Sequence, residues 1–123
     1  MELKIKAIRD RGEKDERLFI EVMEDCSLGD FIVYDETFDA NGNKSNLWPH
    51  MYRFDRRSVK KGEFISLRVH TGNDYVGTLD DKQTTCYYLY WGFDDSFQVF
   101  NKDGDIVHLV KISSETTCKI ASK

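Results

Sequence analysis

The sequence predicts an all-β fold, and three observations support this prediction. Aromatic and β-branched residues fill residues 87–93, a composition typical of strands. Asp103-Gly104 stands between two apolar runs, which indicates a tight hairpin because glycine accepts the positive φ that such a turn requires. No segment sustains the 3.6-residue period of an amphipathic helix. Short strands at regular intervals predict a β-sandwich or a small barrel of about eight strands.

The first three strands follow from alternation and from the turns between them. Leu3, Ile5 and Ala7 alternate with lysines until a charged, glycine-containing loop over residues 9–16 breaks the pattern. Residues 18–23 alternate again. A turn then leads into the apolar run 31–34, which is suited to a strand covered on both faces.

The longest loop separates these strands from the rest of the chain. Residues 39–43 tolerate turn geometry, and irregular sequence continues to a short strand expected at 50–54. A turn precedes the strand 65–70, where alternation predicts one buried face and one solvated face that carries Ser66, Arg68 and His70. The remaining strands are expected at 87–93, 97–100 and 106–112.

Length and composition fit one folded domain over residues 1–123. The 123 residues are 40% hydrophobic and 33% charged, with a single proline, so the chain has enough apolar residues to build a core. The formal net charge is −4, which gives no overall attraction to phosphate backbones or anionic lipids. These values disfavour a disordered chain and a general nucleic-acid or membrane-surface binder.

The N-terminus and the cysteines favour a cytoplasmic protein. Three of the first six residues are charged, where a signal peptide would need an apolar stretch, and no window approaches the roughly 18 apolar residues of a membrane span. Cys26, Cys86 and Cys118 are odd in number and form no CxxC pair. We expect three buried, reduced thiols.

The second half of the chain carries a distinctive order of motifs. It runs from Phe54 through Val59-Lys60-Lys61-Gly62-Glu63, a strand ending in Thr71-Gly72, Leu89-Tyr90-Trp91-Gly92, and Phe100-Asn101-Lys102-Asp103-Gly104-Asp105 to Leu109. This order resembles the lamin tail domain family, mainly over residues 54–109. Phe100 stands where that family usually has tryptophan, and Lys102 stands where it has a second asparagine. The resemblance implies an immunoglobulin-like β-sandwich that contacts proteins and chromatin.

No metal or cofactor site is expected. Asn101, Asp103 and Asp105 offer oxygen atoms but lack the ligand series of an EF-hand, and turn formation explains them. Residues 39–43 are similarly incomplete. His50, His70 and His108 lack the spacing that would aim two of them at one metal from a single element. His108 shares the parity of Ile106 and Val110, which favours a partly buried, hydrogen-bonded histidine.

Three aromatic residues are the candidate partner-binding residues. In the strand 87–93, Tyr88 and Tyr90 point away from the face that holds Trp91. Tyrosines there either pack across strands or form a contact surface. Trp48 lies in the long loop, where it either plugs the end of the sandwich or serves as an exposed anchor. We therefore expect a noncatalytic interaction module that binds a protein partner or a second copy of itself.

Two other functions stay open at this point. A small hydrolase or ligand-binding domain would need residues assembled from distant positions, because no nucleophile in the sequence has a neighbouring base. Nucleic-acid binding would use the cationic segment from Arg53 to Lys61 together with nearby aromatic residues. A pocket that holds a histidine and a carboxylate together would favour the first of these functions.

Overall fold

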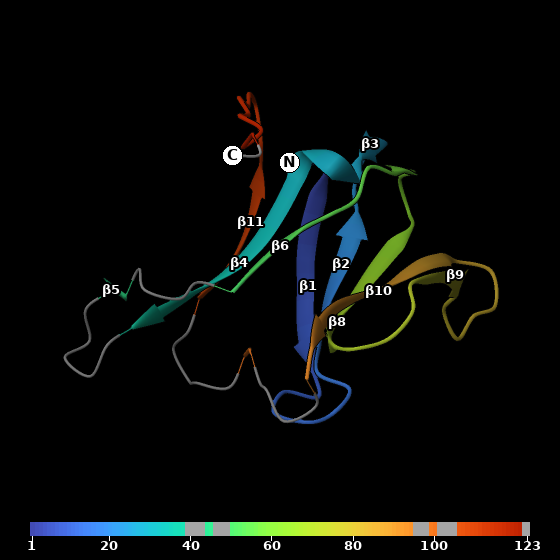
Figure 1. Ribbon diagram of the computed structural model, residues 1–123. Helices are drawn as coiled ribbons and strands as arrows, with labels where there is room; N and C mark the ends of the chain where they lie inside the picture. The colour runs from blue at the N-terminus through green and yellow to red at the C-terminus, as the bar shows by residue number, and fades with distance from the viewer. Residues whose placement is uncertain (39–43, 46–49, 95–98, 101–105, 122–123) are drawn as a thin grey trace.

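The computed structural model describes residues 1–38, 44–45, 50–94, 99–100 and 106–121. Within these residues the chain is nearly all-β (Figure 1). The strands are β1 (Leu3–Arg9), β2 (Arg17–Val22), β3 (Cys26–Ser27), β4 (Phe31–Phe38), β5 (Lys44–Ser45), β6 (Met51–Arg53), β7 (Ser58–Val59), β8 (Phe64–His70), β9 (Tyr75–Thr78), β10 (Thr85–Phe93) and β11 (Ile106–Lys111). One 3-10 turn, η1 (Leu28–Asp30), precedes β4.

Two main sheets share the core. The larger one has five strands in the order β1-β2-β8-β10-β9, and all neighbours are antiparallel except β8 and β10. In the other, β4 pairs antiparallel with β11, β5 and β6, and β3 pairs with β7 separately. Figure 1 shows the β4 sheet beside β1 and β2. The all-β prediction is confirmed, and this arrangement is consistent with a β-sandwich.

Alternating apolar residues place the core between the sheets. Leu18, Ile20 and Val22 on β2 are fully buried, as are the matching residues Ile65 and Leu67 on β8. The β4 sheet contributes Phe31 and Val33, both fully buried. Each such side chain contributes roughly 1.5–3 kcal/mol by leaving water. Their burial forms one hydrophobic cluster that joins both sheets.

A β-bulge in β1 reverses the pattern that the sequence indicates. Leu3 and Ile5 pair with residues that face the core, but the register shifts between Ile5 and Ala7. An extra residue at a bulge moves the following side chains to the opposite face. Arg9 therefore lies across from Arg17 on the outer side of the sheet.

The predicted strand 97–100 is only partly covered by the structure. Val99 and Phe100 are buried, yet they lie in a bend and not in a strand. Their amides donate to the carboxylate of Glu16, which substitutes for a partner strand. The Asp103-Gly104 hairpin and the Asn101, Asp103 and Asp105 oxygens lie outside the described residues.

The expectation of a solvated face on β8 was wrong for two residues. Ser66 is 2% exposed because Phe19 of β2 and Tyr88 of β10 flank it. His70 is 4% exposed, and its Nδ1 lies 3.0 Å from the carbonyl oxygen of Asp94, just after β10. Both sides of β8 are therefore largely covered, since it is a central strand.

On β11, the residues that share the parity of His108 lie on the outer side of the sheet. Val107 and Leu109 pack on the core, whereas Ile106 and Val110 are exposed. His108 is partly buried, as expected, but on the outer side, where its ring stacks on Tyr34.

The cysteine prediction is partly wrong. All three are free, but only Cys86 is buried, while Cys26 is half-buried and Cys118 is exposed. Cys118 follows β11 in a segment without secondary structure, so no sheet covers it. No helix within the described part of the chain is long and apolar enough to cross a membrane.

Candidate functional site

The outer sheet face is the side of the five-stranded sheet that points away from the core. Strand pairing arranges its side chains in rows. One row contains Arg9 on β1, Arg17 on β2 and Arg68 on β8, each directly opposite the next, and continues to Tyr90 on β10. Like charges directly opposite one another destabilise a sheet. The fold therefore keeps three neighbouring cations at a cost in stability.

The next row on the outer sheet face is aromatic apart from one serine. It runs from Phe19 through Ser66 and Tyr88 to Tyr75. Tyr88 and Tyr75 stack with ring centroids 4.6 Å apart. The guanidinium carbon of Arg9 lies 5.3 Å from the centroid of Phe19, within cation–π range.

The structure places both predicted partner-binding tyrosines on this face, half-buried. The Tyr88 hydroxyl donates to the carbonyl oxygen of Thr78 at 2.9 Å, which ties β10 to β9. The Tyr90 ring covers Gly72 so closely that a Cβ atom there would overlap it. The tyrosines therefore serve cross-strand packing as well as forming part of the face. Trp48 lies outside the described residues.

A hollow of about 540 Å³ opens on the outer sheet face. Its wall is formed by Arg9, Arg17, Phe19, Ser66, Arg68, Leu79, Asp80, Asp81 and Tyr88. The three arginines come from the first row, and the turn between β9 and β10 supplies the two aspartates. The wall therefore combines cations, aromatic rings and two carboxylates.

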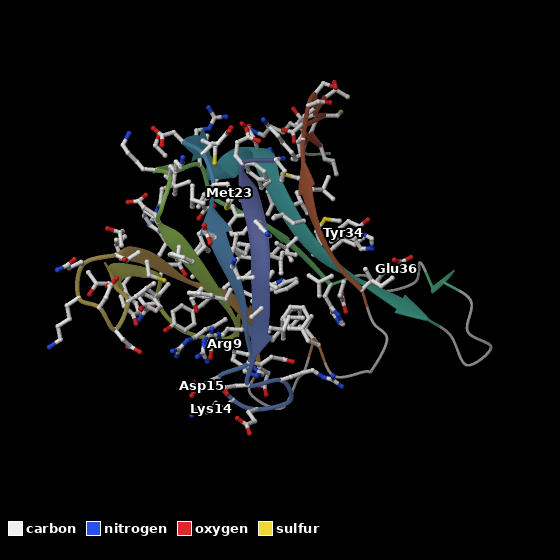
Figure 2. The ribbon with its side chains drawn as sticks, turned by 180° about the vertical axis from the view of Figure 1, so that it is seen from behind. Arg9, Lys14, Asp15, Met23, Tyr34 and Glu36 are labelled. Atoms are coloured by element: carbon white, nitrogen blue, oxygen red, sulfur yellow. The ribbon has the colours of Figure 1, made fainter. Side chains whose placement is uncertain are left out.

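The loop between β1 and β2 partly neutralises the arginines. Arg17 Nη1 donates to Asp10 Oδ2 at 2.6 Å, and Arg68 Nη1 lies 3.5 Å from Asp15 Oδ1. The side chains of these aspartates are 44% and 62% exposed. Exposed pairs of this kind contribute little free energy. Figure 2 shows Arg9 and Asp15 at the same end of the sheet.

Two polar atoms in the wall of the hollow are buried without a hydrogen-bond partner among the described residues. They are Ser66 Oγ and Arg68 Nε. On the rim, Asp81 accepts from the amides of Gln83 and Thr84, and its hydrogen bonds with Thr84 lower its pKa. The Asp81 carboxylate is thus engaged within its own turn.

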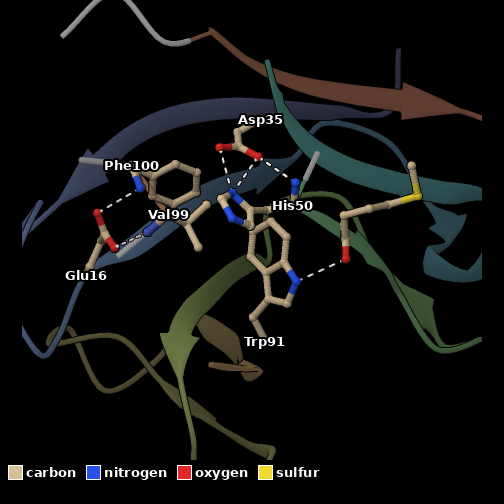
Figure 3. A network of polar contacts seen from close by, with 7 residues as sticks. Glu16, Asp35, His50, Trp91, Val99 and Phe100 are labelled. Atoms are coloured by element: carbon tan, nitrogen blue, oxygen red, sulfur yellow. Dashed lines mark hydrogen bonds and ion pairs between the residues drawn. The ribbon is translucent and has the colours of Figure 1, made fainter. Parts of the chain in front are cut away.

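The buried carboxylate of Glu16 joins the loop that carries Asp10 and Asp15 to Val99 and Phe100, whose bonds to Glu16 are drawn in Figure 3. Its Oε1 accepts from the amides of Gly12 and Phe100, and its Oε2 from that of Val99. Glu16 is fully buried. These bonds make it a structural residue, since both oxygens are satisfied by backbone donors.

Two histidine–carboxylate pairs lie elsewhere in the fold. Asp35, 1% exposed, accepts from the backbone amide of His50 and lies 2.9 Å from its Nδ1 (Figure 3). His108 Nε2 lies 2.8 Å from Glu36 Oε2. Neither pair lines the hollow on the outer sheet face or either of two other hollows, of about 510 and 280 Å³, among the described residues.

Among the described residues, neither a reactive thiolate nor a metal-ligating cluster is found on the outer sheet face. Burial raises the pKa of the Cys86 thiol, which disfavours the reactive thiolate. Within residues 1–38, 44–45, 50–94, 99–100 and 106–121, no group of three metal-ligating side chains comes together. The second metal candidate, residues 39–43, is not described.

Two arginines of the cationic segment predicted for nucleic acid make local contacts. Arg53 pairs with Glu115 and donates to the carbonyl oxygen of Gly29. Arg57 lies over the ring of Tyr87. Arg56, Lys60 and Lys61 are exposed, and nucleic-acid binding through this segment stays a prediction.

Sequence reasoning missed the arginine row. It placed Arg9 in a loop, did not single out Arg17, and assigned Arg68 only to a solvated face. Equal spacing of Arg9 and Arg17 from the middle of the charged loop was a usable signal, because hairpin partners are equidistant from their turn. Arg68 joins the row only through tertiary pairing.

No family model matches the chain, and no curated protein matches it significantly. The function must be inferred from the geometry of the outer sheet face.

Proposed function

We propose that this protein is a noncatalytic interaction module that binds a protein partner through the outer sheet face. The observation that carries the proposal is the row of Arg9, Arg17 and Arg68 in direct register across three strands. Asp10 and Asp15 neutralise this row only in part, and an acidic partner would supply further opposite charge, which favours binding.

The surroundings of the row favour an interaction surface. Arginine and tyrosine are enriched in protein interfaces because both combine a large contact area with hydrogen bonding. Tyr88 and Tyr90 lie beside the row and are held by their own contacts, so they lose little rotamer entropy on binding. A protein-binding role also agrees with what the resemblance to the lamin tail domain implies.

The test compares an Arg17→Gln/Arg68→Gln variant with an Arg56→Gln control. Arg56 is exposed between β6 and β7, away from the row. Proteins retained from an extract of the native cell would be quantified for each form, and self-association would be followed by sedimentation velocity. We expect at least one protein, or the self-association, to be retained by the parent and by Arg56→Gln but lost by the double variant. Equal retention and equal self-association by all forms would contradict the proposal.

A urea titration separates loss of binding from loss of folding. Removing two like charges relieves repulsion between the strands. The lost ion pairs with Asp10 and Asp15 contribute little free energy, because both aspartates are exposed. The double variant should therefore remain within about 1 kcal/mol of the parent in free energy of unfolding.

A further inference from the structure

The hollow on the outer sheet face contains polar atoms that the described fold leaves unsatisfied. Ser66 is 2% exposed, lines the hollow and has no partner for its Oγ among the described residues. Arg68 Nε in the same wall is buried and equally unpartnered. Buried polar groups are nearly always hydrogen-bonded, so an unsatisfied pair at one hollow points to a ligand.

The chemistry of these groups defines what the ligand must bring. A guanidinium has only donors, and a serine hydroxyl can also donate. Arg9, Arg17 and Arg68 add three positive charges within two strand spacings, roughly 10 Å. The ligand must therefore supply several acceptor oxygens and negative charge.

We propose that this hollow binds a phosphorylated side chain of the partner protein, with Arg17, Arg68 and Ser66 as the donors. The inference rests on the proposed binding function and specifies its ligand. A phosphate brings close to two negative charges and three acceptor oxygens.

A carboxylate suits the hollow less well. Asp10 and Asp15 already give Arg17 and Arg68 one carboxylate each. A carboxylate ligand would only exchange one such pair for another, whereas a phosphate dianion offers more charge and an extra oxygen to Ser66.

The aromatic residues argue for a protein ligand and against a nucleic acid. Base recognition on a sheet needs free ring faces for stacking. Tyr88 stacks on Tyr75, and Phe19 stacks on Phe64 while Arg9 lies over it. The net charge of −4 also opposes a long polyanion, while one phosphate needs only the local cations.

The rim adds a preference for the neighbouring residue of the partner. Asp80 and Asp81 line the same hollow from the β9–β10 turn. They would repel an acidic residue beside the phosphate and attract a basic one. The preferred ligand is therefore a phosphorylated residue with a lysine or arginine next to it in the partner's sequence.

The experiment titrates the full ¹⁵N-labelled chain with a short peptide containing phosphoserine followed by lysine. Comparison peptides carry serine or glutamate in place of phosphoserine, or glutamate in place of the lysine, and an oligo(U) strand represents nucleic acid. We expect the Arg68 Nε–Hε signal to shift saturably, with serine and glutamate peptides binding at least tenfold more weakly. Equal binding by the serine peptide, or tighter binding by oligo(U), would overturn the inference.

The variants locate the site. Arg17→Gln and Arg68→Gln should each weaken the affinity for the phosphopeptide by about tenfold or more, because each removes charge-assisted hydrogen bonds. Ser66→Ala should weaken it severalfold, and Arg56→Gln should leave it unchanged. Phosphopeptide binding that survives both arginine substitutions would place the phosphate elsewhere and refute the assignment.

Phosphatase treatment of the cell extract separates this inference from the proposed function. Loss of the retained partner after phosphatase treatment supports both the interaction module and the phosphate site. A partner that needs the arginines but survives phosphatase supports the interaction module and overturns the phosphate site. Phosphopeptide binding without any arginine-dependent partner or self-association would instead contradict the proposed function alone.

Discussion

Replacing Glu16 by alanine should destabilise the fold strongly. The side chain is fully buried, and its oxygens accept from the amides of Phe100 at 3.2 Å and of Val99 and Gly12 at 3.3 Å. The residues Val99 and Phe100 are themselves buried, outside any strand. Their amides would lose their acceptor without gaining water.

The magnitude follows from these two donors. Each buried donor left unsatisfied costs about 1–3 kcal/mol, which gives roughly 2–6 kcal/mol for the pair. Removing the buried carboxylate also removes its desolvation penalty, which offsets part of this loss in free energy. We therefore expect a loss of about 3 kcal/mol, a large share of the 5–15 kcal/mol typical of a domain.

The assay is urea unfolding followed by tryptophan fluorescence and circular dichroism. Glu13→Ala is the matched control, since Glu13 is an exposed glutamate in the same loop. It should change the free energy of unfolding by less than about 0.5 kcal/mol. Glu16→Gln should lose an amount of free energy of unfolding between those of Glu13→Ala and Glu16→Ala. The new amide keeps one acceptor oxygen, but its nitrogen faces a backbone donor. A Glu16→Ala protein within about 1 kcal/mol of the parent would refute the reasoning.

Three further predictions concern other parts of the fold. Gly72→Ala should cost about 1–3 kcal/mol, because the new Cβ would overlap the Tyr90 ring, and in a Tyr90→Ala background that cost should largely disappear in a double-mutant cycle of urea unfolding. A thiol reagent should label Cys118 rapidly and Cys86 only after denaturation, as mass spectrometry of the native protein would reveal; rapid Cys86 labelling would contradict its burial. Burial raises the pKa of Tyr52 to about 12 from an ordinary value near 10, so its neutral form stabilises the fold below pH 10, and this contribution is lost as the pH rises toward 12. A Tyr52→Phe protein should show a shallower fall in stability across that range, and an unchanged slope would be the contrary result.

The sequence predicted the features that depend on near neighbours. Alternation of Leu18, Ile20 and Val22 identified the buried face of β2, since a two-residue period alone sets that face. The same rule put Tyr88 and Tyr90 on the outer side of β10, where the structure has them outside the core cluster.

Only the tertiary structure decided which side chains meet. The bulge after Ile5 moved Arg9 to the outer face, and pairing of β2 with β8 brought Arg68 opposite Arg17 from about fifty residues away in the chain. Burial of Ser66 likewise depends on both flanking strands. Parity within a strand is local, but register between strands depends on core packing and turn geometry, and so the candidate site emerged only from the assembled sheet.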